Sequence, residues 1–116
     1  MPYNEALANR VRELIAARED NVEEKRMFGG LAFLVNTKIC VAVKSDKILV
    51  RIDPNLFEKE VQGLGCTPMR MSSRESKSFL FVDEDVLDTH SKLKRWVDLA
   101  LEYNPRANAT PREKKK

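Results

Sequence analysis

The sequence predicts an α+β domain with the element order α-β-β-β-α-β-β-α, in which helices pack on one face of an antiparallel five-stranded sheet. Two observations lead to this prediction. Residues 25–52 contain three apolar runs of period two, separated by two short polar breaks, as in an antiparallel meander. Amphipathic helical patterns stand near both ends of the chain, and its length of 116 residues suits one domain.

The first helix is predicted over residues 5–18. Asn4 suits its N-cap, and apolar residues recur at helical spacing in an otherwise charged segment. The predicted apolar stripe consists of Leu7, Val11, Leu14 and Ile15. Residues 20–25 are acidic and then basic with a single apolar residue, so we interpret them as a loop or a short extended lead-in to the sheet.

Three strands follow, and strict alternation assigns their side chains to two sides. In the second strand this places Ile39, Val41 and Val43 together on one side. In the third, Arg51 projects from the side opposite to Val50, and we expect it to be solvated if no helix covers that side.

Two-residue breaks join these strands, which predicts tight hairpins at Asn36-Thr37 and Ser45-Asp46. A primed turn favours glycine at its second loop position, where a β-branched residue is strained. Thr37 therefore favours a longer loop or another type of turn at the first hairpin.

A second helix is predicted over residues 54–62, because Asp53 suits an N-cap and Pro54 suits the first helical position. Gly63 is its expected C-terminal stop. The predicted apolar side consists of Leu56, Phe57 and Val61.

The rest of the chain predicts two strands and a final helix. Residues 64–71 suit an irregular edge strand, because Pro68 cannot donate to a sheet ladder. We interpret residues 72–76 as a polar turn and the continuous apolar run at residues 78–82 as a strand buried on both sides. The last helix is predicted over residues 88–103, with a stripe of Leu93, Trp96, Val97, Ala100 and Leu101, and Pro105 ends it.

The positive charge is concentrated at the C-terminus. Residues 1–103 carry 16 Lys and Arg against 17 Asp and Glu, whereas residues 104–116 carry five against one. This balance disfavours a strongly basic DNA-binding domain. We predict a domain at residues 1–104 and a disordered basic tail at residues 105–116. The tail cations that could add weak, salt-sensitive binding of nucleic acid are Arg112, Lys114, Lys115 and Lys116.

The sequence offers little catalytic chemistry. The only histidine, His90, is expected at the exposed start of the last helix, and Cys40 and Cys66 form neither a disulfide framework nor a zinc motif. The acidic run at residues 83–85 suits a helix entrance better than a cation site. We therefore expect reduced, largely buried thiols, no metal or cofactor, and no enzymatic activity. Without a membrane-length apolar run or a secretion signal, a cytoplasmic location is expected.

Gly29 and Gly30 are the most informative local signal. Phosphate-binding glycine loops lead from a strand into a helix, whereas these glycines lead into a strand. A bend or bulge where another backbone approaches closely is therefore favoured over a phosphate site. Neighbouring Lys25, Arg26 and Phe28 add two cations and an aromatic ring, so this corner, residues 25–30, is a candidate surface for a partner.

Several features together resemble a known family. They are the segment KRMFGGLAFLVN at residues 25–36, the strands ICVAV, ILVRI and SFLFVD, the pair Pro68-Met69, and a final helix with Leu93 and Trp96-Val97. This combination resembles the N-terminal domain of the TfoX/Sxy family of bacterial competence regulators over residues 4–103. Thr37 and Ser78 depart from the glycines usual at these positions.

The resemblance implies an α+β domain of the secretion-chaperone-like type with a role in transcription regulation, where full-length family members act with the cyclic-AMP receptor protein. Those regulators carry a second domain, so we expect a stand-alone version of the first. It implies no catalytic residue. The leading hypothesis is a non-enzymatic interaction domain that binds a protein partner, such as a transcription factor, through the residue 25–30 corner or an exposed sheet face. The alternatives are a weak nucleic-acid binder that uses the tail and, least favoured, a small enzyme with an unrecognised site.

Overall fold

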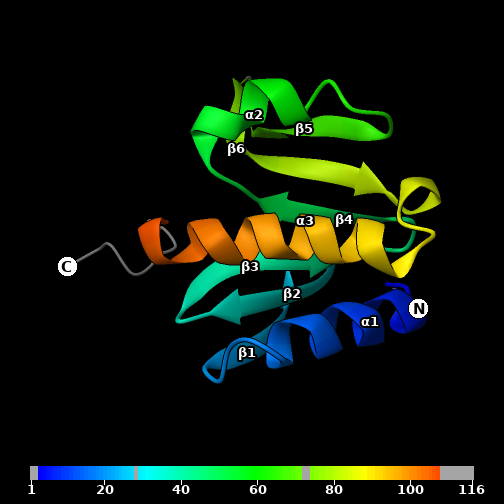
Figure 1. Cartoon of the computed structure of the whole chain (residues 1–116), viewed down its shortest axis with the longest axis vertical. Coiled ribbons are helices and arrows are strands. Elements are labelled where there is room, and N and C mark those ends of the chain that lie inside the picture. Colours follow the sequence, from blue (N-terminus) through cyan, green and yellow to red (C-terminus); the bar gives the residue numbers. More distant parts are fainter. Residues whose placement is uncertain (1–2, 28, 72–73, 108–116) are drawn as a thin grey trace.

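The structure, a computed structural model, describes residues 3–27, 29–71 and 74–107 (Figure 1). Its α-helices are α1 (Glu5–Ala16), α2 (Pro54–Glu60) and α3 (His90–Tyr103). Its strands are β1 (Val22–Met27), β2 (Gly30–Val35), β3 (Lys38–Val43), β4 (Lys47–Arg51), β5 (Cys66–Met71) and β6 (Arg74–Asp83). Two short 3-10 helices, η1 (Glu84–Val86) and η2 (Asn104–Arg106), flank α3.

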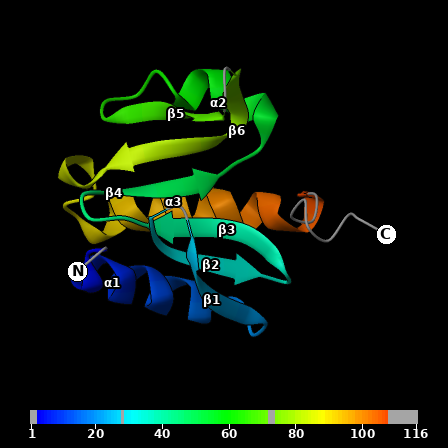
Figure 2. The same ribbon diagram turned by 180° about the vertical axis from the view of Figure 1, so that it is seen from behind.

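All strands belong to one antiparallel sheet with the order β1-β2-β3-β4-β6-β5. Strands β1 to β4 form a meander, and β6 then pairs with β4 while β5 forms the far edge. Helices α1 and α3 lie in front of the sheet in Figure 1 and behind it in Figure 2. The predicted α+β class and antiparallel sheet are confirmed, but the predicted count of five strands is wrong because β1 adds a sixth.

Strand β1 covers most of the segment interpreted as a lead-in. It pairs with β2 along its whole length, from Val22 opposite Val35 to Met27 opposite Gly30. Its sequence, VEEKRM, has no alternating apolar pattern because it lies at a sheet edge and its side chains are largely outside the core. Charged side chains suit an edge strand, since they discourage pairing with another chain.

The hairpin between β2 and β3 keeps its tight turn. Asn36 and Thr37 both have positive φ, of 53° and 70°, as a primed two-residue turn requires. The expectation of a longer loop or another type of turn is therefore wrong, and the turn holds a β-branched residue in a strained conformation. The predicted second hairpin is confirmed, because the Lys44 amide donates to the Lys47 carbonyl oxygen at 2.8 Å around Ser45-Asp46.

A β-bulge in β3 changes which side chains face the helices. Phe33 lies opposite Val41, and the next residue of β2 lies opposite Ile39, so Cys40 is the extra residue. Cys40 and Val41 both join the core beneath the helices, whereas Ile39 faces the other side of the sheet. Strict alternation placed Ile39 with Val41, and that prediction is wrong because a bulge reverses the side-chain order beyond it.

Helices α1 and α3 cover one face of the sheet. Asn4 caps α1 by accepting a 3.0 Å hydrogen bond from the Leu7 amide, as predicted, and all five predicted stripe residues of α3 are buried. Helix α2 follows its predicted N-cap, Asp53, but only Phe57 of its predicted apolar side is buried. Leu56 is 38% exposed, which corrects its assignment to the apolar side.

The second half of the sheet follows the prediction in part. Strand β5 is an irregular edge strand, with a register shift between Pro68 and Arg70. Strand β6 begins earlier than predicted, at Arg74, while residues 72–73 of the predicted turn lie outside the described residues. Leu80 and Val82 are buried, but Phe79 and Phe81 are only partly buried. The prediction that this strand is buried on both sides is therefore wrong on the side of the two phenylalanines.

A buried polar residue, which the sequence analysis did not single out, connects the end of α3 to the sheet by a hydrogen bond. Asn104 is 2% exposed, and its Nδ2 donates a 3.1 Å hydrogen bond to the Val35 carbonyl oxygen. Lys38 Nζ donates to the carbonyl oxygens of Asn104 and Pro105 at 3.3 and 3.4 Å. These contacts tie the helix end to the β2–β3 hairpin.

Candidate functional site

The sheet face away from α1 and α3 has its own small apolar cluster. Figure 2 views the molecule from this side, where the strands lie in front of α3. The buried members are Ala32, Leu34, Ile39, Ala42 and Leu49, and the partly buried members are Met27, Met69, Phe79 and Phe81. Every member lies on a strand, so in the described part of the chain no helix contributes to this cluster. We call this side of the sheet the open face.

Cations lie over the two aromatic rings of the open face. Lys44 Nζ and Lys47 Nζ are 5.7 and 5.4 Å from the centroid of the Phe81 ring. The guanidinium carbon of Arg51 is 5.2 Å from the centroid of the Phe79 ring, in agreement with the register that pairs these two residues across β4 and β6. An ammonium or guanidinium group at such a distance is attracted to the ring face.

Strand alternation adds two more cations, Lys25 and Lys77, to this side. Lys25 lies opposite Ala32, and Lys77 precedes Phe79 by two residues. Some of the positive charge is balanced locally. Lys47 lies 3.9 Å from Asp46, and the Nζ of Lys77 lies 3.6 Å from a Glu58 oxygen. Because such exposed pairs are weak, the open face remains apolar with a cationic rim.

Arg51 differs from the lysines around it. It is half-buried, and its Nε is buried without a hydrogen-bond partner among the described residues. Burial lowers the pKa of the Arg51 guanidinium from its ordinary value. None of the described helices covers this face, as the sequence allowed. The expectation that Arg51 would then be solvated is wrong, because its guanidinium packs against the Phe79 ring.

The structure places the predicted partner-binding residues on two sides of β1. Lys25 lies opposite Ala32 and faces the open face, whereas Arg26 lies opposite Leu31 and faces the helices. The guanidinium carbon of Arg26 is 5.9 Å from the Tyr3 ring centroid. Phe28 lies outside the described residues.

The two glycines of the corner have different structural roles. Gly29 has φ +73°, a conformation that favours glycine. Gly30 lies against the backbone of β3, where a β-carbon would collide with the Val43 carbonyl oxygen and lie 3.0 Å from its carbonyl carbon. The close approach of another backbone, favoured from the sequence, is therefore what Gly30 provides.

Comparison with known families identifies the chain. Residues 13–103 match the TfoX N-terminal domain family. The chain belongs to this family. The match covers most of the sequence, from within α1 to the end of α3, and no curated protein sequence matches the chain.

Within the described residues, this TfoX N-terminal domain has no group of three or more His, Cys, Asp or Glu side chains that could hold a metal ion. His90 is exposed at the start of α3. Both cysteines are free, and burial raises the pKa of the Cys40 thiol to about 12 and also raises that of Cys66, so neither thiol is activated as a nucleophile.

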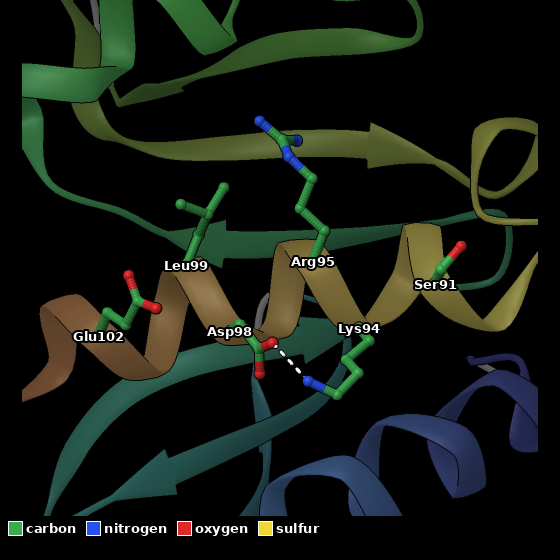
Figure 3. Close-up of a pocket in the computed structure, with 6 residues that line it drawn as sticks. All are labelled: Ser91, Lys94, Arg95, Asp98, Leu99 and Glu102. Atoms are coloured by element: carbon green, nitrogen blue, oxygen red, sulfur yellow. Dashed lines mark hydrogen bonds and ion pairs between the residues drawn. The ribbon is translucent and has the colours of Figure 1, made fainter.

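A shallow hollow on the outer side of α3 offers no better site in this TfoX N-terminal domain (Figure 3). Three of its charged side chains, Lys94, Arg95 and Asp98, already have partners. Lys94 Nζ lies 2.8 Å from an Asp98 oxygen, and Arg95 Nη2 lies 2.8 and 2.7 Å from the two Glu60 oxygens. The open face is therefore the stronger candidate.

Two further observations bear on the alternatives. Arg112, Lys114, Lys115 and Lys116, the predicted nucleic-acid contacts, lie outside the described residues. No helix in the described ranges is both long enough and apolar enough to cross a lipid bilayer.

Proposed function

We propose that the chain is a non-enzymatic regulatory domain that acts by binding a protein partner. Membership of the TfoX N-terminal domain family supports a regulatory role related to competence. The partner that we propose is a transcription regulator. The catalytic hypotheses have little support, because burial raises the pKa of both free thiols and the described residues hold no cluster of metal-ligating side chains.

The open face is the observation that favours this function most. A strand-only cluster with partly exposed methionine and phenylalanine side chains, rimmed by cations, has the composition of a protein-binding surface. Lys25 belongs to the same side of the sheet, so part of the predicted corner contributes to it. Arg26 would contact a partner only if that partner also reached the helix side of β1.

Affinity capture from source cells, followed by binding measurements on the two purified proteins, tests this function. The variants are Lys25→Glu and Arg26→Glu, and the control is Lys92→Glu on α3, where the lysine pairs with Asp88 at 3.2 Å. We expect a transcription regulator to bind the wild type and the control, and to lose affinity for Lys25→Glu. A captured regulator that binds all variants equally would contradict the proposed surface.

The basic tail supplies the competing function. If the chain acts through nucleic acid, its affinity for duplex DNA falls steeply with salt and disappears when residues 108–116 are removed. The deletion has to begin after Ala107, because Ala107 is buried and Arg106 pairs with Asp53 at 2.7 Å. That result, without a bound protein, would replace the protein-binding function by a nucleic-acid-binding one.

A further inference from the structure

Arg51 presents a guanidinium, a group that binds carboxylates, on the open face. Within the described part of the chain its Nε is buried without a hydrogen-bond partner, and the side chain is half-buried on the open face. A buried polar group without a partner costs stability, and such groups are uncommon in folded proteins. A guanidinium that has already lost water around Nε binds a planar anion at a smaller further cost than a solvated one.

Arg95 is a second arginine that lies over an aromatic ring, and it also has a carboxylate partner. Its guanidinium carbon lies 5.0 Å from the Trp96 ring centroid, much as Arg51 lies over Phe79. Arg95 also contacts both carboxylate oxygens of Glu60, at 2.8 and 2.7 Å. The two arginines therefore share an arrangement over an aromatic ring, but among the described residues only Arg95 pairs with a carboxylate.

The surroundings of Arg51 favour a carboxylate on a protein over a nucleic-acid phosphate. The accessible side chains of the open face near Arg51 include the apolar Phe79, Phe81 and Met69 beside the lysines of the rim. Carboxylates also lie at the rim, since Asp46 is 3.9 Å from Lys47 and Asp83 lies opposite Lys47 in the β4–β6 ladder. These carboxylates repel the many negative charges of a nucleic acid. A segment with a single carboxylate beside bulky apolar side chains can pair with the arginine and pack on the apolar surface.

We infer that the open face binds a segment of a partner protein in which Asp or Glu stands beside bulky apolar residues, and that Arg51 receives the carboxylate. The apolar side chains of the segment pack on Phe79, Phe81 and Met69, and the methionine adapts to their shape. Lys44 and Lys47 favour an acidic segment over a basic one. The chain's own tail is not the occupant, because residues 108–116 carry four cations against one carboxylate. This inference rests on the proposed function and names the chemistry of the partner.

A phage library of random 16-residue peptides, panned on the purified full chain, tests this inference. The enriched peptides are expected to contain Asp or Glu next to Leu, Ile, Phe or Met. Their dissociation constants are then measured with wild type, Arg51→Met and the matched control Arg95→Met. Arg51→Met should weaken binding about tenfold or more, the scale of a hydrogen bond to a charged group, and Arg95→Met should leave it unchanged.

Further measurements test the peptide carboxylate and guard against a variant that does not fold. Replacing each Asp and Glu of an enriched peptide by Asn and Gln should weaken binding to the wild type as much as Arg51→Met does. If Arg51→Met fails to fold, Arg51→Lys keeps the charge but loses the bidentate geometry, and it should still weaken binding. A wild-type NMR titration with the same peptide needs no variant, and the Phe79 and Phe81 ring signals should shift.

Several results would overturn the inference. They are no enriched peptide, enriched peptides without carboxylates, equal binding by Arg51→Met, or ring signals that do not move. Binding of a random-sequence 20-nucleotide single strand at Arg51, without peptide binding, would assign the face to nucleic acid. A concentration-dependent dimer lost in Arg51→Met would assign it to a second copy of the chain. If binding of a captured regulator depends on Lys25 but not on Arg51, the proposed function holds and this inference fails. If peptides bind at Arg51 but no cellular regulator is captured, this inference holds and the proposed function fails.

Discussion

Gly30 of β2 lies so close to the Val43 carbonyl group of β3 that the two backbones leave no room for a β-carbon. Gly30 therefore meets a packing requirement, whereas Gly29 meets a requirement for positive φ.

This contact predicts that Gly30→Ala destabilises the domain by about 1–3 kcal/mol, the usual cost of forcing an extra methyl group into a packed site. Gly29→Ala should cost about 1 kcal/mol, since its β-carbon would meet only the Lys44 ammonium at 3.4 Å but φ stays at +73°. Urea unfolding of both variants measures the difference. A Gly30→Ala midpoint equal to that of the wild type would show that the strands separate there at no cost.

Thr37 predicts a gain in stability. Its φ of +70° strains a β-branched residue, and glycine relieves that strain. We expect Thr37→Gly to stabilise the domain by about 0.5–1 kcal/mol, after allowance for the greater freedom of glycine in the unfolded chain. Thermal melts compare it with Asn36→Gly, which should change less because asparagine tolerates positive φ. An unchanged or lower Tm for Thr37→Gly would contradict the strained turn.

The buried hydrogen bond of Asn104, which lies outside the open face, predicts that its removal lowers stability. Removing its amide in Asn104→Ala leaves the buried Val35 carbonyl oxygen without this hydrogen bond, at a cost of about 1–3 kcal/mol. Asn55→Ala, at an exposed position of α2, is the control and should stay within about 0.5 kcal/mol of the wild type. Denaturant titrations measure the free energy of unfolding of both variants. Equal midpoints would mean that water replaces the Asn104 amide.

The ion pair between α1 and β1 predicts how stability depends on pH. Arg12 donates to Glu24 at 2.6 and 2.8 Å and holds the pKa of that carboxyl below its ordinary value of 4.5. A depressed carboxyl pKa adds stability that is complete above the ordinary value and is lost as the pH falls through the folded-state value. We expect the free energy of unfolding contributed by this pair to be constant from pH 7 to about 5 and to fall below pH 4.5.

Unfolding titrations from pH 7 to 3 measure this dependence. Glu24→Gln should lower stability at pH 7 and show a smaller decrease on acidification, whereas Glu13→Gln, at an exposed position of α1, should follow the wild type. Parallel pH profiles for wild type and Glu24→Gln would contradict the contribution of the pair.

The helices were predictable because their signals are local. Asn4 and Asp53 accept hydrogen bonds from the first turns of α1 and α2, and buried residues recur at helical spacing along α3. Strand β1 was not predictable in this way, because backbone pairing with β2 and not an apolar pattern forms it. The bulge at Cys40 was also hidden, since one extra residue leaves the apolar composition of β3 unchanged.

In the candidate site, too, local features were predictable from the sequence and features that depend on strand pairing were not. Alternation correctly placed Arg51 on the side opposite to Val50. Its burial could not be predicted, because it depends on Phe79 from β6, which reaches β4 only through the order of strands in the sheet. The corner at residues 25–30 looked continuous in sequence, but strand alternation sends Lys25 and Arg26 to opposite sides of β1.

The central claim is that the open face, and not the helix side, is the binding surface of this TfoX N-terminal domain. A methyl NMR titration of the captured regulator, or of an enriched peptide, tests it most directly. The methyl signals of Met27 and Met69 report the open face, and those of Leu93 report the core beneath α3. The account predicts that the two methionine signals shift in the wild type and shift much less in Arg51→Met at the same ligand concentration, while Leu93 does not respond in either protein. Saturable binding with unmoved methionine signals would contradict it.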